Sequence, residues 1–427
     1  MKKSAIFIRS VLILLLPALM IQCQGGGRKT DTQKVEKLSL DTCPAFPLEG
    51  WEHFYKPAFE GFMHAYQPCV VEVPDTEFPY RMWFFGWVTD IANPGLAGAD
   101  AIYFARGRDL DTWEVYCKDG SWDETGDNER WASVLYSSDD PKDYYQTFHT
   151  GDPSVVLKDG VYYMAYSATS QAFVDPDSPE LVLPPTFSNM DIEGYPARMI
   201  QCVMGATSTD GINWTKTEKP LLLGEADTKF PPDPAPHRIG DFHRPCLLWD
   251  DEGERWMLYF DYRNMALGLG SIVGLAENKG DFMTGDFEFV HSLDEPLLTG
   301  WPNPEMVRVG PCYVSFSDAP GYTRATAPEG REVSAWQLRQ LRMATSDDGL
   351  TWEKQYYFDP DPGMDADHVP QALVTRRDGK WWLYCFYTTQ VGWRWEEGKY
   401  PFFKKGDYNW FYDQVRYMRQ EIRAGKN

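Results

Sequence analysis

Hydrophobic and polar positions along the chain form a pattern of short paired strands. The clearest example covers residues 151–167, where two runs of β-branched and aromatic residues flank the turn Lys158-Asp159-Gly160. Such runs favour extended strands, and a short turn ending in glycine joins them as a hairpin. Pro153 stands at the expected entrance of the first strand, where its missing N–H costs least.

The same hairpin pattern occurs five times. Each copy has a proline, an apolar strand, a short polar turn and an aromatic-rich strand, and the prolines are Pro68, Pro153, Pro245, Pro304 and Pro370. Further strand-like sequence follows each copy, in three cases with an Asp-containing turn that ends in Trp. Repeats that each supply four short strands are typical of β-propeller blades. The sequence therefore predicts an all-β, five-bladed β-propeller; a β-sandwich would need five similar hairpins by coincidence.

The N-terminus differs from the rest of the chain. Lys2 and Lys3 precede an apolar run over residues 11–21, which has the length of a signal-peptide core, and Cys23 follows it. This pattern predicts a lipoprotein-type signal over residues 1–23, although Gln22 stands where a small residue is usual. A cleaved, soluble secretory signal is the alternative.

Residues 24–40 are polar and glycine-rich, which predicts a flexible tether before a propeller domain over residues 41–427. We expect export to the cell envelope, in the periplasm or on the outer membrane surface, with membrane contact only through a lipid anchor at Cys23. The net charge of −22 would repel nucleic acid phosphates, so a nucleic acid partner is excluded.

The eight cysteines are widely spread, and seven remain if Cys23 is lipidated. Cys69, Cys246 and Cys385 lie on strands predicted near the propeller axis, where they are interpreted as small buried hydrophobic residues. A disulfide between Cys43 and Cys117 is possible, but the sequence leaves the pairing open.

The topology of a blade predicts which residues lie together at a candidate functional site. The first strand of a hairpin starts at one face and the second returns to it, so residues before each proline and after each second strand share the mouth of a central funnel. The residues so placed are His64, Tyr66, Gln67, Trp87, Asp90, His149, Asp152, Ser167, Gln171, Asp241, His243, Arg244, Asp261, Arg263, Trp301, Asn303, Glu305, Ser317, Asp318, Asp365, Asp367, His368, Thr388 and Gln390.

Carboxylates, histidines and aromatic rings are mixed in this set, and the mixture suits sugars. Carboxylates and amides hydrogen-bond hydroxyl groups, while aromatic faces stack on the C–H side of a sugar ring. Two carboxyl groups across a funnel are also what glycosidic cleavage needs, because one protonates the leaving oxygen and the other activates water or attacks the anomeric carbon.

The five hairpins, the Asp152-Pro153 step, the Asp-Gly turns followed by Trp, and His368 in the last blade resemble the five-bladed propeller glycoside hydrolases of families 43, 32, 62, 68, 117 and 130, above all family 43. The similarity spans residues 60–390. It implies that Glu305 is the general acid, Asp152 the general base, and Asp241 the group that tunes the pKa of the acid. The residues then expected to bind substrate are Asp90, His243, Arg244, Asp261, Asp367, His368 and Trp301.

Two positions depart from the family pattern. Gln67 stands in the first blade where the family has its base, which makes Asp90 an alternative base. Glu305 follows its proline, whereas the family usually places the Glu ahead of it. A buried Glu on an apolar strand is costly without a role, so function is favoured for Glu305.

The resulting prediction is a glycoside hydrolase that cleaves plant or algal poly- or oligosaccharides, with exo action and inversion. Exo action is expected because the proline-rich segment 175–196 and the aromatic residues Trp393 and Trp395 would narrow the funnel. No cofactor or catalytic metal is predicted, although Asp365, Asp367 and His368 could hold a structural Ca²⁺ near the axis. The alternatives are a propeller phosphorylase, with phosphate bound by His243, Arg244 and Arg263, and a non-catalytic glycan-binding lipoprotein.

Overall fold

The computed structural model describes residues 38–59, 65–74, 76–86, 101–137, 145–146, 149–174, 181–182, 197–223, 239–264, 267–320, 339–362, 364, 366–391 and 412–423. The predicted signal, Cys23, most of the tether, Asp90 and most of the two rim segments lie outside these residues. Leu38–Asn427 forms one compact unit. Within the described ranges, no helix has the length and apolar character that crossing a membrane requires.

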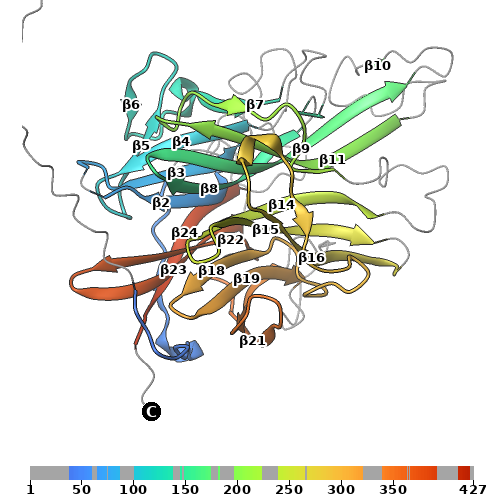
Figure 1. Ribbon diagram of the computed structural model, residues 1–427. Helices are drawn as coiled ribbons and strands as arrows, with labels where there is room; N and C mark the ends of the chain where they lie inside the picture. The colour runs from blue at the N-terminus through green and yellow to red at the C-terminus, as the bar shows by residue number, and fades with distance from the viewer. Residues whose placement is uncertain are drawn as a thin grey trace, which may run out of the picture. The chain divides into compact units, whose positions relative to one another are not determined.

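Five antiparallel sheets make up the described part of the chain (Figure 1). The first sheet contains β2 (Tyr66–Glu72), β3 (Tyr80–Gly86), β4 (Ala101–Gly107), β5 (Trp113–Tyr116) and β6 (Trp122–Asp123), with β7 (Ser133–Tyr136) beside β4. The second contains β8 (His149–Lys158), β9 (Val161–Val174), β11 (Ala197–Ser208) and β12 (Thr215–Lys216), with β10 (Leu181–Val182) beside β9 and β13 (Leu222–Leu223) beside β11.

The other three sheets have four strands each. They are β14 (Ile239–Asp250), β15 (Arg255–Asn264), β16 (Leu269–Asn278) and β17 (Glu288–Phe289); β18 (Glu305–Val309), β19 (Cys312–Pro320), β20 (Arg339–Ser346) and β21 (Glu353–Tyr357); and β22 (Ala366–Arg377), β23 (Lys380–Val391), β24 (Tyr412–Glu421) and β1 (Glu52–Phe54). The helical elements in the described ranges are the short 3₁₀ turns η1 (Leu48–Gly50), η2 (Asn128–Arg130) and η4 (Phe282–Thr284).

The sheets form a closed ring. The first strands β2, β8, β14, β18 and β22 each contact the next, and β22 contacts β2. The fifth sheet takes its outermost strand, β1, from the N-terminal end of the unit, with Glu52 opposite Arg419 on β24. This pairing closes the ring with a strand that precedes the first blade in the chain. The predicted five-bladed β-propeller is confirmed.

The core is divided among the five interfaces between neighbouring blades, with one buried hydrophobic cluster at each. Alternation along the strands explains this arrangement, because successive side chains point to opposite faces of a sheet. On β3, Trp83 packs toward the second blade while Phe84 packs toward the fifth. Both faces of a blade are therefore buried, which explains why the second strands are nearly continuous apolar runs.

The Asp-Gly turns that precede Trp connect one blade to the next through hydrogen bonds. In the second blade, the Asp210 carboxylate accepts the N–H groups of Ile212 and Asn213, both at 2.8 Å. The Gly211 carbonyl accepts the indole N–H of Trp83 in the first blade at 3.0 Å. In the fourth blade, the Gly349 carbonyl likewise accepts the Tyr259 hydroxyl of the third blade at 3.1 Å.

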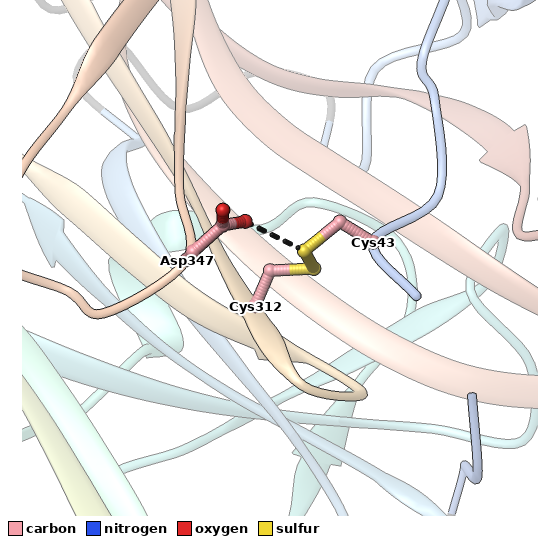
Figure 2. A group of neighbouring side chains, drawn as sticks. All are labelled: Cys43, Cys312 and Asp347. Carbon is pink, nitrogen blue, oxygen red and sulfur yellow. Dashed lines mark hydrogen bonds between the residues drawn. A yellow bond between two sulfur atoms is a disulfide. The ribbon is translucent and has the colours of Figure 1, made fainter. Parts of the chain in front are cut away.

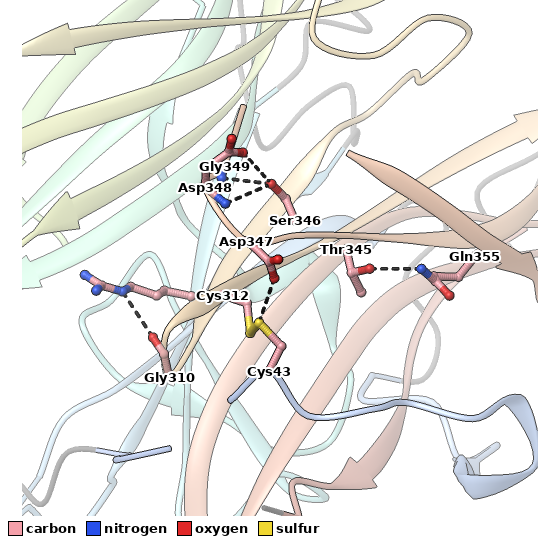
Figure 3. The surroundings of a disulfide bond; sticks show 10 residues. Cys43, Gly310, Cys312, Thr345, Ser346, Asp347, Asp348, Gly349 and Gln355 are labelled. Atoms are coloured by element: carbon pink, nitrogen blue, oxygen red, sulfur yellow. Dashed lines mark hydrogen bonds between the residues drawn. A yellow bond between two sulfur atoms is a disulfide. The ribbon is translucent and has the colours of Figure 1, made fainter. Parts of the chain in front are cut away.

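Cys43 forms a disulfide with Cys312, which lies 269 residues later at the start of β19. The possible pairing of Cys43 with Cys117 is wrong, since Cys117 is buried and not disulfide-bonded. Cys43 Sγ lies 2.9 Å from an Asp347 carboxylate oxygen (Figure 2). Because a disulfide sulfur carries no proton to donate, we interpret this approach as a packing contact. Figure 3 shows that the bond lies beside the turn that begins at Ser346.

Replacing Cys43 and Cys312 together by Ala should lower the free energy of unfolding by about 2–4 kcal/mol, because a long loop in the unfolded chain is no longer closed. Urea unfolding of the parent and the double variant measures the difference. Cys117→Ala, which removes a buried thiol but no cross-link, is the control. An unchanged unfolding midpoint in the double variant would contradict the prediction.

Candidate active site

Four of the five inner strands have an irregularity in their pairing next to the proline. The pairing of β8 with β9 shifts between Gly151 and Ser154, and equivalent shifts occur in the first, third and fifth blades. The residues directly before the five prolines all have positive φ, between 43° and 53°, and we call them the mouth ring: Gln67, Asp152, Arg244, Asn303 and Val369. Positive φ is uncommon outside glycine, and β-bulges re-aim side chains next to functional sites.

Four of the prolines therefore lie inside the strands, at bulges, rather than at the strand entrances that the sequence predicted, while Pro304 directly precedes β18 as predicted. For Pro153 the strand already begins at His149. A bulge interrupts the ladder of hydrogen bonds, so a residue without an N–H is tolerated there as it is at a strand end.

Backbone N–H groups of the mouth ring bond to residues on the second strand of the preceding blade. The N–H of Arg244 donates to Ser167 Oγ at 2.7 Å, that of Val369 to Asp318 Oδ2 at 2.7 Å, and that of Gln67 to Thr388 Oγ1 at 3.2 Å. The N–H of Asn303 bonds to Asp261. The structure thus brings together four of the residues that the hairpin topology placed after the second strands.

Asp152 is held in its ionised form. It is only 3% exposed, so burial alone would raise its pKa. The Arg244 guanidinium, followed by His149 and Ser167, outweighs burial and holds the pKa of this carboxyl well below its usual range. The Nε2 atom of His149 lies 3.7 Å from Asp152 Oδ2.

The absence of a side chain at Gly151 leaves room for the His149 ring. A Cβ atom at Gly151 would lie 2.9 Å from His149 Cε1 and 2.9 Å from the ring of Phe85. The two rings meet edge to face, with centroids 5.5 Å apart. A side chain at residue 151 would therefore push the imidazole away from Asp152.

Gly151→Ala should lower stability by roughly 1–3 kcal/mol, because the new methyl group overpacks this contact. If the mouth ring is the site of function, the same change should also reduce turnover. Gly160→Ala is a control for glycine replacement in the same hairpin, since a Cβ there meets nothing within 4 Å, although its φ of +79° adds strain of its own. Urea unfolding and a rate assay check the prediction, and equal turnover in the parent and Gly151→Ala would contradict it.

Asp261 has the opposite environment to Asp152. It is 1% exposed, and burial raises its pKa in spite of His243, Arg244 and the Asn303 N–H, which lower it. His243 Nε2 lies 3.8 Å from Asp261 Oδ2. Two carboxyl groups on neighbouring blades therefore have pKa values shifted in opposite directions.

A chain of charged and polar groups joins the third, fourth and fifth blades at the mouth. Arg244 donates to the Asn303 side chain, whose amide donates to Asp318. Asp318 also accepts the Val369 N–H and pairs with Arg339 at 3.1 Å. Burial would lower the pKa of Arg244, but Tyr66, followed by Asp152, Asp318 and Asp261, outweighs burial and raises it.

Arg339 is the member of this chain that the sequence did not place. It begins β20, the third strand of its blade, whereas the prediction considered only positions beside the first two strands. Burial lowers its pKa although Asp318 opposes that effect. No short turn signal joins β19 to β20 in the sequence, so reasoning from hairpins did not extend to this strand.

A second ring lies two residues after the mouth ring, and we call it the acceptor ring: Cys69, Ser154, Cys246, Glu305 and Gln371. Each of these side chains accepts the backbone N–H of an inner strand in the next blade. The bonds are Val155 N–H to Cys69 Sγ (3.2 Å), Leu247 N–H to Ser154 Oγ (2.8 Å), Met306 N–H to Cys246 Sγ (3.2 Å), Ala372 N–H to Glu305 Oε1 (3.0 Å) and Val70 N–H to Gln371 Oε1 (3.1 Å). The first strand of each blade is nearest the propeller axis and forms the edge of its sheet. Its outward N–H groups therefore have no neighbouring strand and need such partners.

Glu305 therefore has a structural partner that the sequence did not predict. The residue as a whole is partly exposed, but protein atoms surround its carboxyl group. Burial raises the pKa of Glu305 to about 8, and the Ala372 N–H and Cys246 oppose the rise. Glu305 would thus carry a proton near neutral pH.

Besides Asp261, three of the predicted binding residues are buried. Trp301 is 1% exposed, packs between the third and fourth blades, and donates its indole N–H to Ser315 Oγ at 2.9 Å. Asp367 is 3% exposed and accepts the Asp361 N–H at 2.7 Å. His368 is also 3% exposed and meets the Tyr66 ring edge to face, with centroids 5.3 Å apart. Trp301 and Asp367 are thus engaged in structural contacts, while His368 lies directly before a mouth-ring residue.

Two of the residues predicted for catalysis or substrate binding are not placed, and His64, Trp87 and Asp365 of the predicted mouth also lie outside the described residues. Asp90 lies outside the described residues, and Asp241 lies on β14 without a described side chain.

One group of possible metal ligands occurs in the described part of the chain, with ligand atoms within 4.8 Å of one another: Cys43, Cys312 and Asp347. Its two sulfur atoms form the disulfide, so neither is a thiolate that could bind a metal. Asp365 lies outside the described residues, and a structural Ca²⁺ near Asp367 and His368 stays a prediction.

The fold is similar to that of five-bladed propeller glycoside hydrolases. A thermostable family 43 glycoside hydrolase matches with a TM-score of 0.48 at 14% identity, over 85% of this chain and 92% of that one. A family 117 glycoside hydrolase from the marine bacterium Zobellia galactanivorans has a TM-score of 0.47 at 12% identity, over 88% and 94%. A family 32 β-fructofuranosidase from Bombyx mori has a TM-score of 0.46 at 15% identity, over 85% and 61%.

At these identities the likeness concerns the fold and assigns no activity. No protein-family model matches the sequence. No curated protein matches it either.

Proposed function

We propose that the protein is a glycoside hydrolase whose chemistry takes place at the mouth ring. The observation that carries the proposal is the convergence of three buried carboxylates, Asp152, Asp261 and Asp318, with two arginines and two histidines at one end of the closed ring. Buried ionisable groups with shifted pKa values cluster at functional sites. The mixture of carboxylate, amide and imidazole groups suits the hydroxyl groups of a sugar.

Asp152 is the proposed general base. Its lowered pKa keeps the carboxylate ionised near neutral pH, so that it can accept a proton from water. The sequence assigns the acid role to Glu305 and the tuning role to Asp241. A pKa of about 8 would supply a protonated Glu305, while its bond to the Ala372 N–H gives the same carboxyl a structural task.

The proposed substrates are plant or algal oligosaccharides, attacked from a chain end with inversion. Inversion calls for acid and base groups roughly 6.5–9.5 Å apart, with room for water between them. The Cys43–Cys312 disulfide supports the proposed export, because disulfides persist in oxidising compartments. Attachment to the membrane through Cys23 is part of the same proposal.

The experiment that tests this proposal is a hydrolysis screen. The protein lacking residues 1–23 is incubated with aryl glycosides and with plant and algal oligosaccharides, and the anomer of the product is followed by NMR. Release of a sugar with inverted configuration supports the proposal. Binding without release favours the glycan-binding alternative, and sugar 1-phosphate formed only with inorganic phosphate favours a phosphorylase.

A further inference from the structure

Two histidines at the mouth ring stand in front of buried aspartates in the same way. His243 Nε2 lies 3.8 Å from Asp261 Oδ2, with the two side chains 28% and 2% exposed. His149 Nε2 lies 3.7 Å from Asp152 Oδ2, with the side chains 19% and 4% exposed. In each pair the imidazole is the member that solvent, and therefore a substrate, can reach. The pairs lie on neighbouring blades, on β8 and at the β14–β15 hairpin.

The two pairs differ in which positive group most strongly opposes the effect of burial on the pKa of the aspartate. For Asp152, the Arg244 guanidinium is the strongest opposing charge, ahead of His149. For Asp261, His243 is the strongest opposing charge, ahead of Arg244, and the Oδ1 atom has no hydrogen-bond partner among the described residues. The carboxylate of Asp261 therefore depends more on a positive charge at His243 than Asp152 depends on one at His149.

We propose that His243, positioned by Asp261, is the proton donor to the glycosidic oxygen. This inference rests on the proposed function and assigns the acid role to a residue that the sequence had placed only in substrate binding. The proton leaves Nδ1, the ring nitrogen that does not face Asp261. Asp261 is a positioning residue, since it acts through the imidazole.

The reaction balances with the groups at the mouth. The bond between the anomeric carbon and the glycosidic oxygen breaks, its electron pair goes to that oxygen, and the oxygen receives the His243 proton. Water forms the new bond to the anomeric carbon and gives one proton to the Asp152–His149 pair. Exchange with solvent then returns a proton to His243 and removes one from the base.

Glu305 is the competing candidate, and its surroundings differ. Its Oε1 atom accepts the Ala372 N–H, and the thiols of Cys69, Cys246 and Cys385 are close enough for its charge to raise their pKa values. Each of these thiols is buried. The carboxyl thus faces backbone and thiols, while His243 faces solvent.

Leaving-group dependence separates the two candidates. A 2,4-dinitrophenyl glycoside needs no proton on its leaving oxygen, whereas a methyl glycoside or oligosaccharide of the same sugar does. His243→Gln should lower kcat/KM by roughly 10²–10⁴-fold on the poor leaving group and by less than about tenfold on the dinitrophenyl glycoside. Asp261→Asn should show the same difference in kcat/KM loss between the two substrates, but a smaller one. This second variant keeps the test decisive if His243→Gln folds poorly.

His53→Gln is the matched control. His53 lies 3.8 Å from the buried Asp361, with side-chain exposures of 28% and 1%, but it is on β1, the outermost strand of its blade. It should show no split between the substrates, and neither should Glu305→Gln. An equal loss on both substrates in His243→Gln, or a split in Glu305→Gln instead, overturns the assignment of His243. Failure of the parent to release any sugar overturns the proposed function itself.

Discussion

Asp152→Asn should reduce turnover by roughly 10²–10⁴-fold, the range expected when a general base is lost, while sugar binding persists. The amide keeps the shape of the carboxyl group but carries no charge and cannot take a proton. His149 and Arg244 would lose the carboxylate that both now face. Initial rates and calorimetric titration with the sugar identified by the hydrolysis screen measure the two effects separately.

The control for Asp152→Asn is the same replacement at a buried aspartate far from the mouth. Asp123, on the outer strand β6, is 2% exposed and accepts the indole N–H of Trp131 at 2.9 Å. Asp123→Asn should lower stability but not kcat. If Asp152→Asn keeps more than about a tenth of the parental turnover, the base lies elsewhere and Asp90 becomes the residue to replace.

The fold could be predicted from the sequence because its signals are local. Each hairpin brings its two strands together within about 20 residues, so a proline, an apolar run, a turn and an aromatic run are enough to identify it. Repetition of that unit then predicted the propeller. The same local rule brought Ser167, Asp261, Asp318 and Thr388 to the mouth ring, because the end of a second strand must return to the start of the first.

Contacts between blades could not be predicted in this way, because they join residues that are far apart in the chain. The Cys43–Cys312 disulfide depends on where the segment before β1 crosses the fourth blade. Within the fourth blade, the pairing of Arg339 with Asp318 was missed for a related reason, because the sequence between β19 and β20 carries no short hairpin signal. In addition, each proline has a mouth-ring residue directly before it and an acceptor-ring residue directly after it. A strand pattern alone therefore cannot tell a side chain at the mouth from one deeper along the axis.

Glu305 is the position where this ambiguity has the largest measurable consequence. The carboxyl ionises near 4.5 in its ordinary environment, and burial in the acceptor ring raises its pKa to about 8. Between these values the unfolded chain releases a proton that the folded protein keeps. Stability therefore falls as pH rises through this window, by up to about 1.4 kcal/mol per pH unit, and the loss is complete above the folded-state pKa.

Glu305→Gln should remove this pH dependence without breaking the ring. The amide oxygen of Gln can accept the Ala372 N–H as Gln371 accepts the N–H of Val70. Urea unfolding between about pH 5 and about pH 9 brackets this window. As pH rises, the free energy of unfolding of the parent should fall relative to that of the variant. Parallel stability curves for the two proteins would contradict the prediction.

The reciprocal change at the equivalent position makes the test independent of catalysis. Gln371→Glu places a carboxyl in the acceptor ring of the fifth blade, so it should add a loss of stability with rising pH that the parent lacks at this site. The double variant Glu305→Gln/Gln371→Glu should regain a pH dependence that Glu305→Gln alone has lost. If the dependence follows the carboxyl from one blade to the other, it belongs to the acceptor ring rather than to a feature of the fourth blade, and Glu305 has a structural role whether or not it also donates a proton.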